Sequence, residues 1–274
     1  METGSNLLDQ EIAEILRTVI DEGPDSMLVV NPSKDAIEQL ITVATEYDGE
    51  LPTMQMLAQS DMLKDVMEDF IVASNAADLI DEGVLTLRTA DEVPTNSLLV
   101  TDEVVIALVT ADDRVGGLTA DDEEFVAEAN ESYSERLEEA DEFSLRTPPL
   151  SRVRETLDDE IGPDARDDFE EVLSSMETAR GDGDGLDEVT ISLLVAAKNE
   201  ALLYDISKWG EDVGIASKAT FSRTKTKLED MGLIGTEKVP IDVGRPRLRL
   251  KLANDDLREA DTDQIASVAQ SMLN

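Results

Sequence analysis

The chain has 274 residues and a formal net charge of −40, because 63 acidic residues face only 23 lysines and arginines. Hydrophobic residues make up 41% of it, which is enough for a packed core in one or two domains and excludes wholesale disorder. The chain contains no cysteine and no histidine, so disulfides, thiolate or histidine metal sites and histidine-dependent catalytic triads are excluded.

The acidic residues are spread along the chain rather than gathered in one patch. Residues 1–180 carry a net charge of −35, and residues 181–274 carry −5. Dispersed acid with few lysines is typical of halophiles that accumulate salt, where the Debye length falls to about 3 Å at 1 M. We therefore interpret the charge as an adaptation to salt rather than as a DNA mimic. No apolar run is long enough to span a membrane, and the first five residues lack a secretion signal, so we expect a cytoplasmic protein.

The first half of the chain alternates between helical and strand patterns. Apolar periodicity predicts helices at 6–22, 33–47 and 61–80, and a long charged helix that Thr119 caps after Gly116-Gly117. Short apolar runs predict strands at 27–30, 51–57, 84–88, 97–100 and 104–109, with a hairpin between the last two. This alternation predicts an α/β sensor-like or dimerisation domain over residues 1–147.

The sequence pattern changes at Pro148: in the stretch that follows, helical patterns succeed one another without strand patterns between them. We expect a helical connector over residues 148–180, a linker over 181–186 and a second domain over 187–274. Asp182 and Asp184 in the glycine-rich linker do not supply the ligand positions of an EF-hand calcium loop. We therefore expect no metal and no cofactor.

The second domain has the element order of a winged helix-turn-helix. Asp187 is expected to cap a helix over 188–201, and a second helix over 204–213 leads into the turn Gly214-Ile215-Ala216. Ser217 then caps a third helix over 218–231, which Gly232 ends. Strand patterns at 233–239 and 247–252 follow, joined by residues 240–246. We predict a recognition helix and a two-stranded wing.

The third helix and the wing carry a local reversal of charge. Residues 217–251 hold nine cations and four carboxylates, a net +5. Phe221, Thr224, Leu228 and Met231 share the face expected to point into the core, while the second wing strand alternates leucine inward with cation outward. Such side chains suit the major groove and, at the wing tip, a narrow minor groove. The residues predicted to contact DNA are Ser217, Lys218, Thr220, Ser222, Arg223, Lys225, Lys227, Arg245 and Arg247.

These motifs carry a family resemblance. The segments 217–223 and 227–234 resemble the recognition helix and wing entry of archaeal and bacterial winged-helix regulators, and Gly244-Arg245-Pro246 resembles their wing tip. The whole chain resembles the haloarchaeal TbsP-type transcriptional regulators. That resemblance implies control of sugar-metabolism genes alongside a TrmB-type regulator, through double-stranded promoter DNA. It also implies effector binding or dimerisation by the first domain.

Several alternatives stay open beside this interpretation. A homodimer is expected because dimers read two half-sites, with helices at 163–179 and 261–273 as candidates for pairing. The loop at 29–34 fits either an anion site for an unknown small-molecule effector or an ordinary turn capped by Ser33. The alternative function is a winged-helix module that binds protein without its own DNA specificity. An enzyme with a carboxylate-bound metal at Asp112-Asp113 and Asp121-Asp122 has the least specific support.

Overall fold

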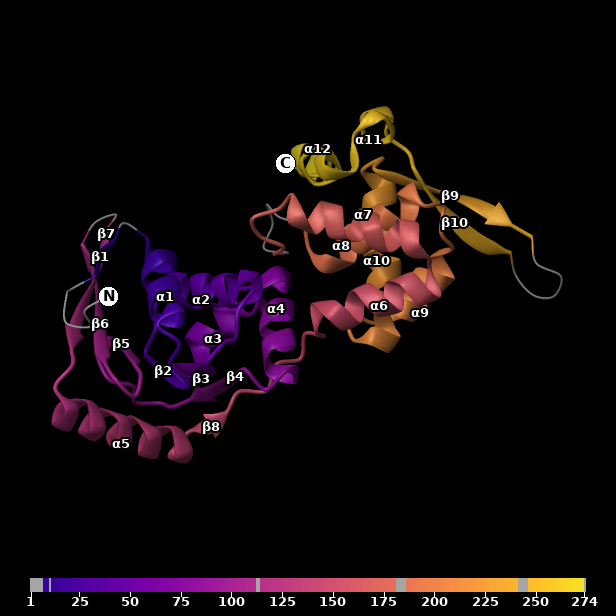
Figure 1. Cartoon of the computed structure of the whole chain (residues 1–274). Coiled ribbons are helices and arrows are strands. Elements are labelled where there is room, and N and C mark those ends of the chain that lie inside the picture. The colour runs from indigo at the N-terminus through magenta and orange to yellow at the C-terminus, as the bar shows by residue number, and fades with distance from the viewer. Residues whose placement is uncertain (1–6, 10, 112–113, 181–185, 241–245, 274) are drawn as a thin grey trace. The chain divides into compact units, whose positions relative to one another are not determined.

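The computed structural model describes residues 7–9, 11–111, 114–180, 186–240 and 246–273. It divides into two compact units, which are treated separately below (Figure 1). The first unit comprises Met1–Glu68 and Asn75–Leu145, and the second comprises Asp69–Ser74 and Arg146–Asn274. Most of the predicted linker, at 181–185, lies outside the described residues.

The first unit is built on a mixed sheet. Its described residues form eight strands in the order β1-β7-β6-β5-β2-β3-β4-β8, in which β2, β3 and β4 are parallel and the other pairs are antiparallel. The bounds are β1 Leu7–Asp9, β2 Ser26–Val30, β3 Thr53–Ala58, β4 Leu85–Thr89, β5 Ser97–Val100, β6 Val105–Ala111, β7 Arg114–Ala120 and β8 Asp141–Glu142.

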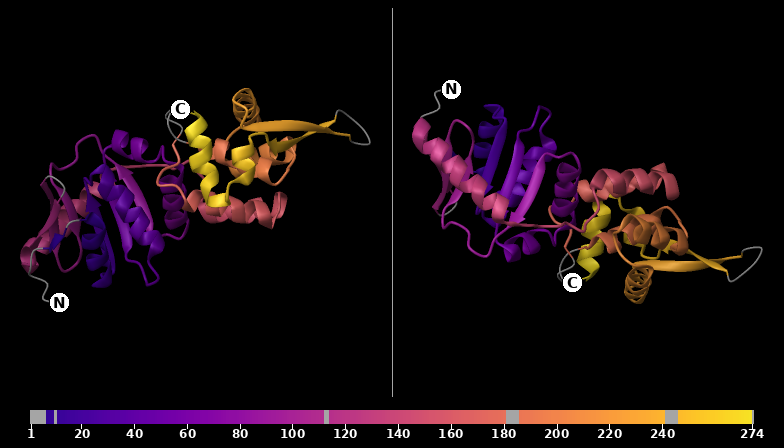
Figure 2. Two further views of the ribbon diagram at one scale, coloured as in Figure 1. Left: turned by 90° about the horizontal axis from the view of Figure 1, so that it is seen from above. Right: turned by 90° about the horizontal axis from the view of Figure 1, so that it is seen from below.

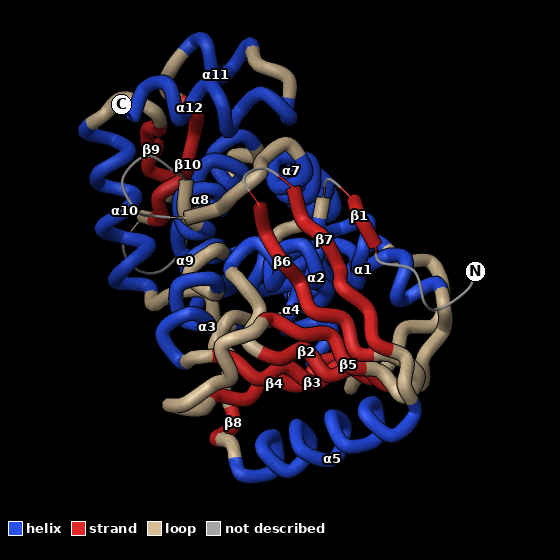
Figure 3. Tube along the Cα trace, turned by 90° about the vertical axis from the view of Figure 1, so that its left-hand side faces the viewer, coloured by secondary structure: helices blue, strands red, loops and turns tan. Residues whose placement is uncertain are grey.

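Helices cover both faces of this sheet. They are α1 Ile12–Asp21, α2 Lys34–Glu46, α3 Ser60–Val66, α4 Phe70–Asp81 and α5 Glu123–Glu139, and the boundary between the units falls within α4. Figure 3 shows α5 along one face of the sheet, with α1 and α2 on the opposite face. Val126 and Leu137 of α5 are buried against apolar side chains of β2 and β5. The predicted α/β domain is confirmed.

Three predicted features of the first unit are wrong in detail: the start of its first helix, the extent of the helix over 61–80, and the cap of α5. The helix expected from residue 6 begins only at Ile12, because Leu7–Asp9 form β1 and pair with β7. The helix expected over 61–80 is two helices, since the Asp69 carboxylate accepts hydrogen bonds from Ile71 N and Val72 N and starts a new one.

Thr119 does not cap α5, because it lies in β7. The pair Gly116-Gly117, which was expected to lead into this helix, instead lies opposite β6, where a Cβ at Gly117 would come within 2.9 Å of Ile106. The Asp122 carboxylate caps α5 by accepting a hydrogen bond from Phe125 N at 3.1 Å.

The second unit is mainly helical. Its elements are α6 Leu150–Glu160, α7 Pro163–Ser174, α8 Glu188–Lys198, α9 Leu203–Val213, α10 Lys218–Asp230, β9 Ile234–Val239, β10 Arg247–Leu252, α11 Asp255–Glu259, the short 3₁₀ helix η1 Thr262–Gln264 and α12 Ile265–Leu273. Antiparallel β9 and β10 form a hairpin that extends from the helices (Figure 1). The expected caps are confirmed, since Asp187 accepts from Thr190 N at 2.7 Å and Ser217 accepts from Thr220 N at 3.2 Å.

One core holds these helices together around Trp209 of α9. The Trp209 ring meets Phe169 of α7 edge-on, with 6.5 Å between the ring centroids, and its Nε1 donates to Thr156 Oγ1 of α6 at 2.9 Å. Phe221 of α10 is fully buried over Gly210 of α9. The Trp209 contacts join α9 to α6 and α7, and the Phe221 ring packs α10 against α9.

Replacing Gly210 with alanine is expected to destabilise the second unit. A Cβ at this position would lie 2.3 Å from the buried Phe221 ring, so α9 and α10 would have to separate. Such overpacking costs about 1–3 kcal/mol of unfolding free energy. Denaturation followed by the fluorescence of Trp209, the single tryptophan, measures it. Gly235→Ala is the matched control, because its Cβ would meet only Ala253 at 3.8 Å. Equal stability of the two variants would contradict the close approach.

Candidate nucleic-acid interface

Helices α9 and α10 meet at a sharp turn. Gly214 takes the left-handed conformation with φ of 101°, which favours glycine, and Ile215 N and Ala216 N both donate to Gly210 O. Ser217 then starts α10, and Gly232 follows its end with φ of 74°. Figure 2 shows α10 at one side of the second unit, with α6 and α7 on the opposite side. The turn therefore leaves one long face of α10 open to solvent.

The predicted division of α10 into an inner and an outer face is confirmed except at Lys225, which was predicted to point outward. Phe221 and Leu228 are buried, while Thr224 and Met231 are half-buried at the edge of the core. Ser222, Arg223 and Lys227 are exposed. Arg223 and Lys227 are four residues apart, so they lie on neighbouring turns of the same face.

Two predicted contact residues of α10 are held by carboxylates. Lys218 Nζ lies 2.6 Å from Glu211 of α9, and this hydrogen bond raises the pKa of Lys218 and lowers that of Glu211. Lys225 Nζ lies 2.6 Å from Glu229, and the Lys225 side chain is only 12% exposed. Glu229 also accepts from Thr236 of β9, so this pair ties α10 to the hairpin. The structure thus separates Lys225 from the outer face.

Arg223 and Lys227 differ from these two lysines. Among the described residues neither has a carboxylate within ion-pair distance, and the Arg223 guanidinium makes one hydrogen bond, to Thr220 Oγ1 at 3.4 Å. Thr220 in turn shares a hydrogen bond with Ser217 Oγ at 3.0 Å. Ser217, Thr220 and Arg223 therefore form a polar row at the N-terminal end of α10. Within the described residues, the part of the outer face around Arg223 and Lys227 therefore offers cations and hydroxyls without a compensating carboxylate.

The cations of β10 are compensated instead. Arg247 lies 3.1 Å from Asp205 and its guanidinium stacks 4.3 Å from the centroid of the Tyr204 ring. Lys251 contacts both Glu237 and Glu200, and these carboxylates raise its pKa. The expected alternation is confirmed, with Leu250 and Leu252 buried and Leu248 half-buried. Arg245 lies outside the described residues.

Lys238 is a cation of the hairpin that the sequence pattern did not single out. It pairs in register with Leu248, so it shares the hairpin face that carries Thr236, whose hydroxyl contacts α10. Its side chain is exposed and has no ion-pair partner within the described ranges. The sequence could have indicated this placement. If residues 240–246 join the two strands, position 238 pairs with position 248.

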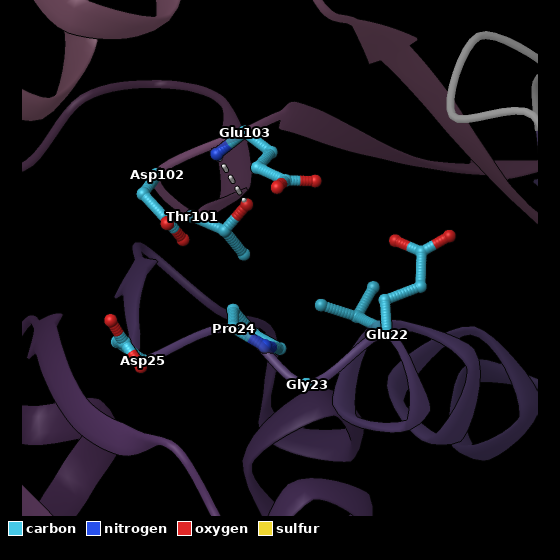
Figure 4. Close-up of a pocket in the computed structure, with 8 residues that line it drawn as sticks. Glu22, Gly23, Pro24, Asp25, Thr101, Asp102 and Glu103 are labelled. Atoms are coloured by element: carbon cyan, nitrogen blue, oxygen red, sulfur yellow. Dashed lines mark hydrogen bonds between the residues drawn. The ribbon is translucent and has the colours of Figure 1, made fainter.

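A second polar feature lies in the first unit. A pocket of about 120 Å³ is edged by the carboxylates of Glu22, Asp25, Asp102 and Glu103. Figure 4 shows these carboxylates on separate sides of the pocket, while Glu103 N donates to Thr101 Oγ1. Across the part of the chain that the structure describes, no group of three acidic residues is close enough to hold a metal ion. Within the same ranges, no helix is long and apolar enough to cross a membrane.

Three helices with a glycine turn before a capped last helix define a helix-turn-helix protein. The chain matches the TbsP-like transcriptional regulator N-terminal domain over residues 4–148 and the TbsP-like C-terminal HTH domain over residues 149–270. It therefore belongs to the TbsP-like transcriptional regulators. Both matched domains are regulator domains, not enzymes.

Other comparisons are more distant. No curated protein matches the chain significantly. A solved structure that resembles part of it is TrmBL2, described as an archaeal chromatin protein with a novel mode of DNA binding, at 17% identity and a TM-score of 0.36. The likeness covers 51% of this chain and 53% of that one, so the chain spans about half the length of this neighbour. A likeness at this level does not bear on function.

Proposed function

We propose that the second unit binds double-stranded promoter DNA with sequence selectivity, by placing the outer face of α10 in the major groove. The observation that supports this most is the pair Arg223 and Lys227 on the last helix of a helix-turn-helix, which are exposed and have no carboxylate partner among the residues that the structure describes. Arginine and lysine donate to guanine edges, and hydroxyls such as those of Ser217 and Ser222 donate to bases or phosphates. Lys218 and Thr220 line the same helix end.

The hairpin acts in this proposal as a wing. Lys238 contacts a phosphate, and Arg245 and Arg247 contact the DNA where the wing approaches the minor groove. Arg247 is ion-paired and stacked on Tyr204, so it is oriented before DNA arrives. Lys225 is left out of the reading surface, because its ion pair with Glu229 supports the helix from inside.

Replacing Lys238 with alanine is expected to weaken binding to all DNA sequences alike. A phosphate contact carries no base information, so the loss should lower the slope of log affinity against log salt by about 1. Titrations of operator and unrelated DNA with the full chain at several KCl concentrations measure this slope. Lys64→Ala is the charge-matched control in the first unit, where Lys64 pairs with Asp61. A change in sequence preference, or an unchanged slope, would count against the phosphate assignment.

The regulator works, in our proposal, as a homodimer in the cytoplasm of a halophilic archaeon. Two half-sites compensate for the small contact area of one helix, especially where salt screens charge. The dimer surface is not assigned, because the apolar faces of α7 and α12, at Phe169, Val172, Ile265 and Ala269, are buried in the core of their own unit. Light scattering in molar KCl should give twice the chain mass of 29.9 kDa, whereas a monomer would contradict the dimer.

The regulated genes are proposed to serve sugar and central carbon metabolism. The family resemblance of the whole chain supports this, and its test is genome-wide mapping of bound sites before and after a change of carbon source. Bound promoters should concentrate on sugar-metabolism genes and change occupancy with the carbon source. Binding to the same promoters only through another regulator would favour the protein-interaction module instead.

A further inference from the structure

The first unit contains a cavity between α5 and the neighbouring strands β5, β6 and β7 of its sheet. The cavity has a volume of about 410 Å³, within the range of about 300–1,000 Å³ in which small-molecule sites fall. Leu98, Ala107 and Leu118 lie side by side across β5, β6 and β7 and form its floor. Phe125 and the next two turns of α5 form the facing wall.

Two large apolar side chains at this cavity remain in water. Leu118 is 48% exposed and Phe125 is 49% exposed, although most large apolar side chains in the described ranges are buried. Water is a poor environment for such side chains, since each Å² of apolar surface removed from it gains about 25 cal/mol. A ligand that covered both would therefore gain affinity from their burial. The site is preformed, because the sheet and α5 that carry the lining residues pack against each other through Val126 and Leu137.

Charge narrows the class of ligand. Among the described residues, the lining contains no lysine or arginine, and Glu128 is its one carboxylate. The exposed side of α5 carries further acids at Glu124, Glu131 and Glu135. A phosphorylated sugar or another anion would meet repulsion without a compensating cation. A second copy of the chain would bring its own acidic α5 toward this one, which disfavours an interface between copies at this place.

Polar groups at the rim are available to orient a ligand. The side chains of Asn96, Ser132 and Tyr133 line the cavity, and none of them has a hydrogen-bond partner among the described residues. An apolar body with a few convergent polar groups is the usual composition of a small-molecule site. Ligands that carry a hydroxyl or carbonyl group beside an apolar body would satisfy these groups.

We propose that this cavity binds an uncharged small molecule with an aromatic or branched aliphatic body, held between Leu118 and Phe125 and oriented by Tyr133, Ser132 and Asn96. The site lies wholly within the first unit. It is separate from the residues proposed to contact DNA, so its test does not depend on that proposal.

The test uses the uncharged fluorescent probe N-phenyl-1-naphthylamine with the full chain in molar KCl. Fluorescence is expected to rise and saturate at one probe per chain. Leu118→Ser and Phe125→Ser should each weaken binding about tenfold or more, because each removes apolar contact from one wall. Val109→Ser is the matched control: Val109 is also 48% exposed and lies on β6, but it does not line the cavity. Thermal melts of all three variants verify that the first unit stays folded.

Four outcomes would overturn the proposal. The first is a probe signal that does not saturate, and the second is unchanged binding by both Leu118→Ser and Phe125→Ser. The third is displacement of the probe by glucose 6-phosphate, which would show that the site accepts an anion. Absence of probe binding, together with a change of oligomeric state in Leu118→Ser, would instead identify this face as a contact between copies.

Discussion

Promoter selectivity is expected to collapse when Arg223 is replaced with alanine. A good arginine contact to a guanine edge discriminates by about 1–3 kcal/mol per base pair, so operator affinity should fall about 5- to 150-fold with little change for unrelated DNA. Arg223 is chosen because it is exposed, has no carboxylate partner in the described parts of the chain and is oriented by Thr220. Electrophoretic shifts with operator and scrambled DNA in high salt measure the difference.

Arg152→Ala is the matched control for this experiment. Arg152 is also exposed and without an ion pair in the described ranges, but it lies on α6, on the side of the second unit opposite α10 (Figure 2). The Arg152→Ala substitution removes the same charge while leaving the proposed reading face intact, so operator binding should stay at the wild-type level. Equal losses in the two variants would mean that net charge, rather than the α10 face, controls binding.

Replacing Phe221 with alanine is expected to have the largest effect on stability. Phe221 is fully buried and is the side chain of α10 that packs on Gly210 of α9. Truncating a buried phenylalanine costs about 3–5 kcal/mol, from lost burial and the cavity that remains. Denaturation monitored by Trp209, which lies in the same core, follows the second unit. The α10 face would lose its support, so operator binding should fall with stability.

Phe125→Ala serves as the control for the phenylalanine truncation. Phe125 is 49% exposed in the first unit, so its loss should leave the Trp209 transition unchanged. Phe221→Leu, which keeps most of the buried volume, should retain a larger part of the stability than Phe221→Ala. A loss below about 1 kcal/mol for Phe221→Ala would contradict the packing of α10 through this ring.

Local signals in the sequence predicted the helix-turn-helix well. Asp187 and Ser217 precede α8 and α10 as caps, and Gly214 and Gly232 supply the left-handed residues that end α9 and α10. Each of these features depends on a few neighbouring residues. Thr119 failed as a cap because Asp122, three residues later, is equally suited, and only the pairing of β7 with β6 decides between them.

Charge was harder to interpret from the sequence than secondary structure. Residues 217–251 carry a net +5, but carboxylates outside that segment neutralise several of its cations, such as Glu211 beside Lys218 and Asp205 beside Arg247. Both of these carboxylates belong to α9. They reach the cations only because tertiary packing brings α9 close to α10 and β10. Exposed pairs contribute little stability, and salt weakens them further. What distinguishes the proposed reading face is therefore where Arg223 and Lys227 lie, not the net charge of the segment.

The most direct test of the α10 assignment is methylation protection of operator DNA by dimethyl sulfate, which attacks guanine N7 in the major groove. The wild-type chain should protect guanines in two half-sites, Arg223→Ala should lose protection at one guanine position in each, and Arg152→Ala should keep the full pattern. Protection confined to the minor groove, or a pattern that Arg223→Ala leaves unchanged, would contradict major-groove reading by α10.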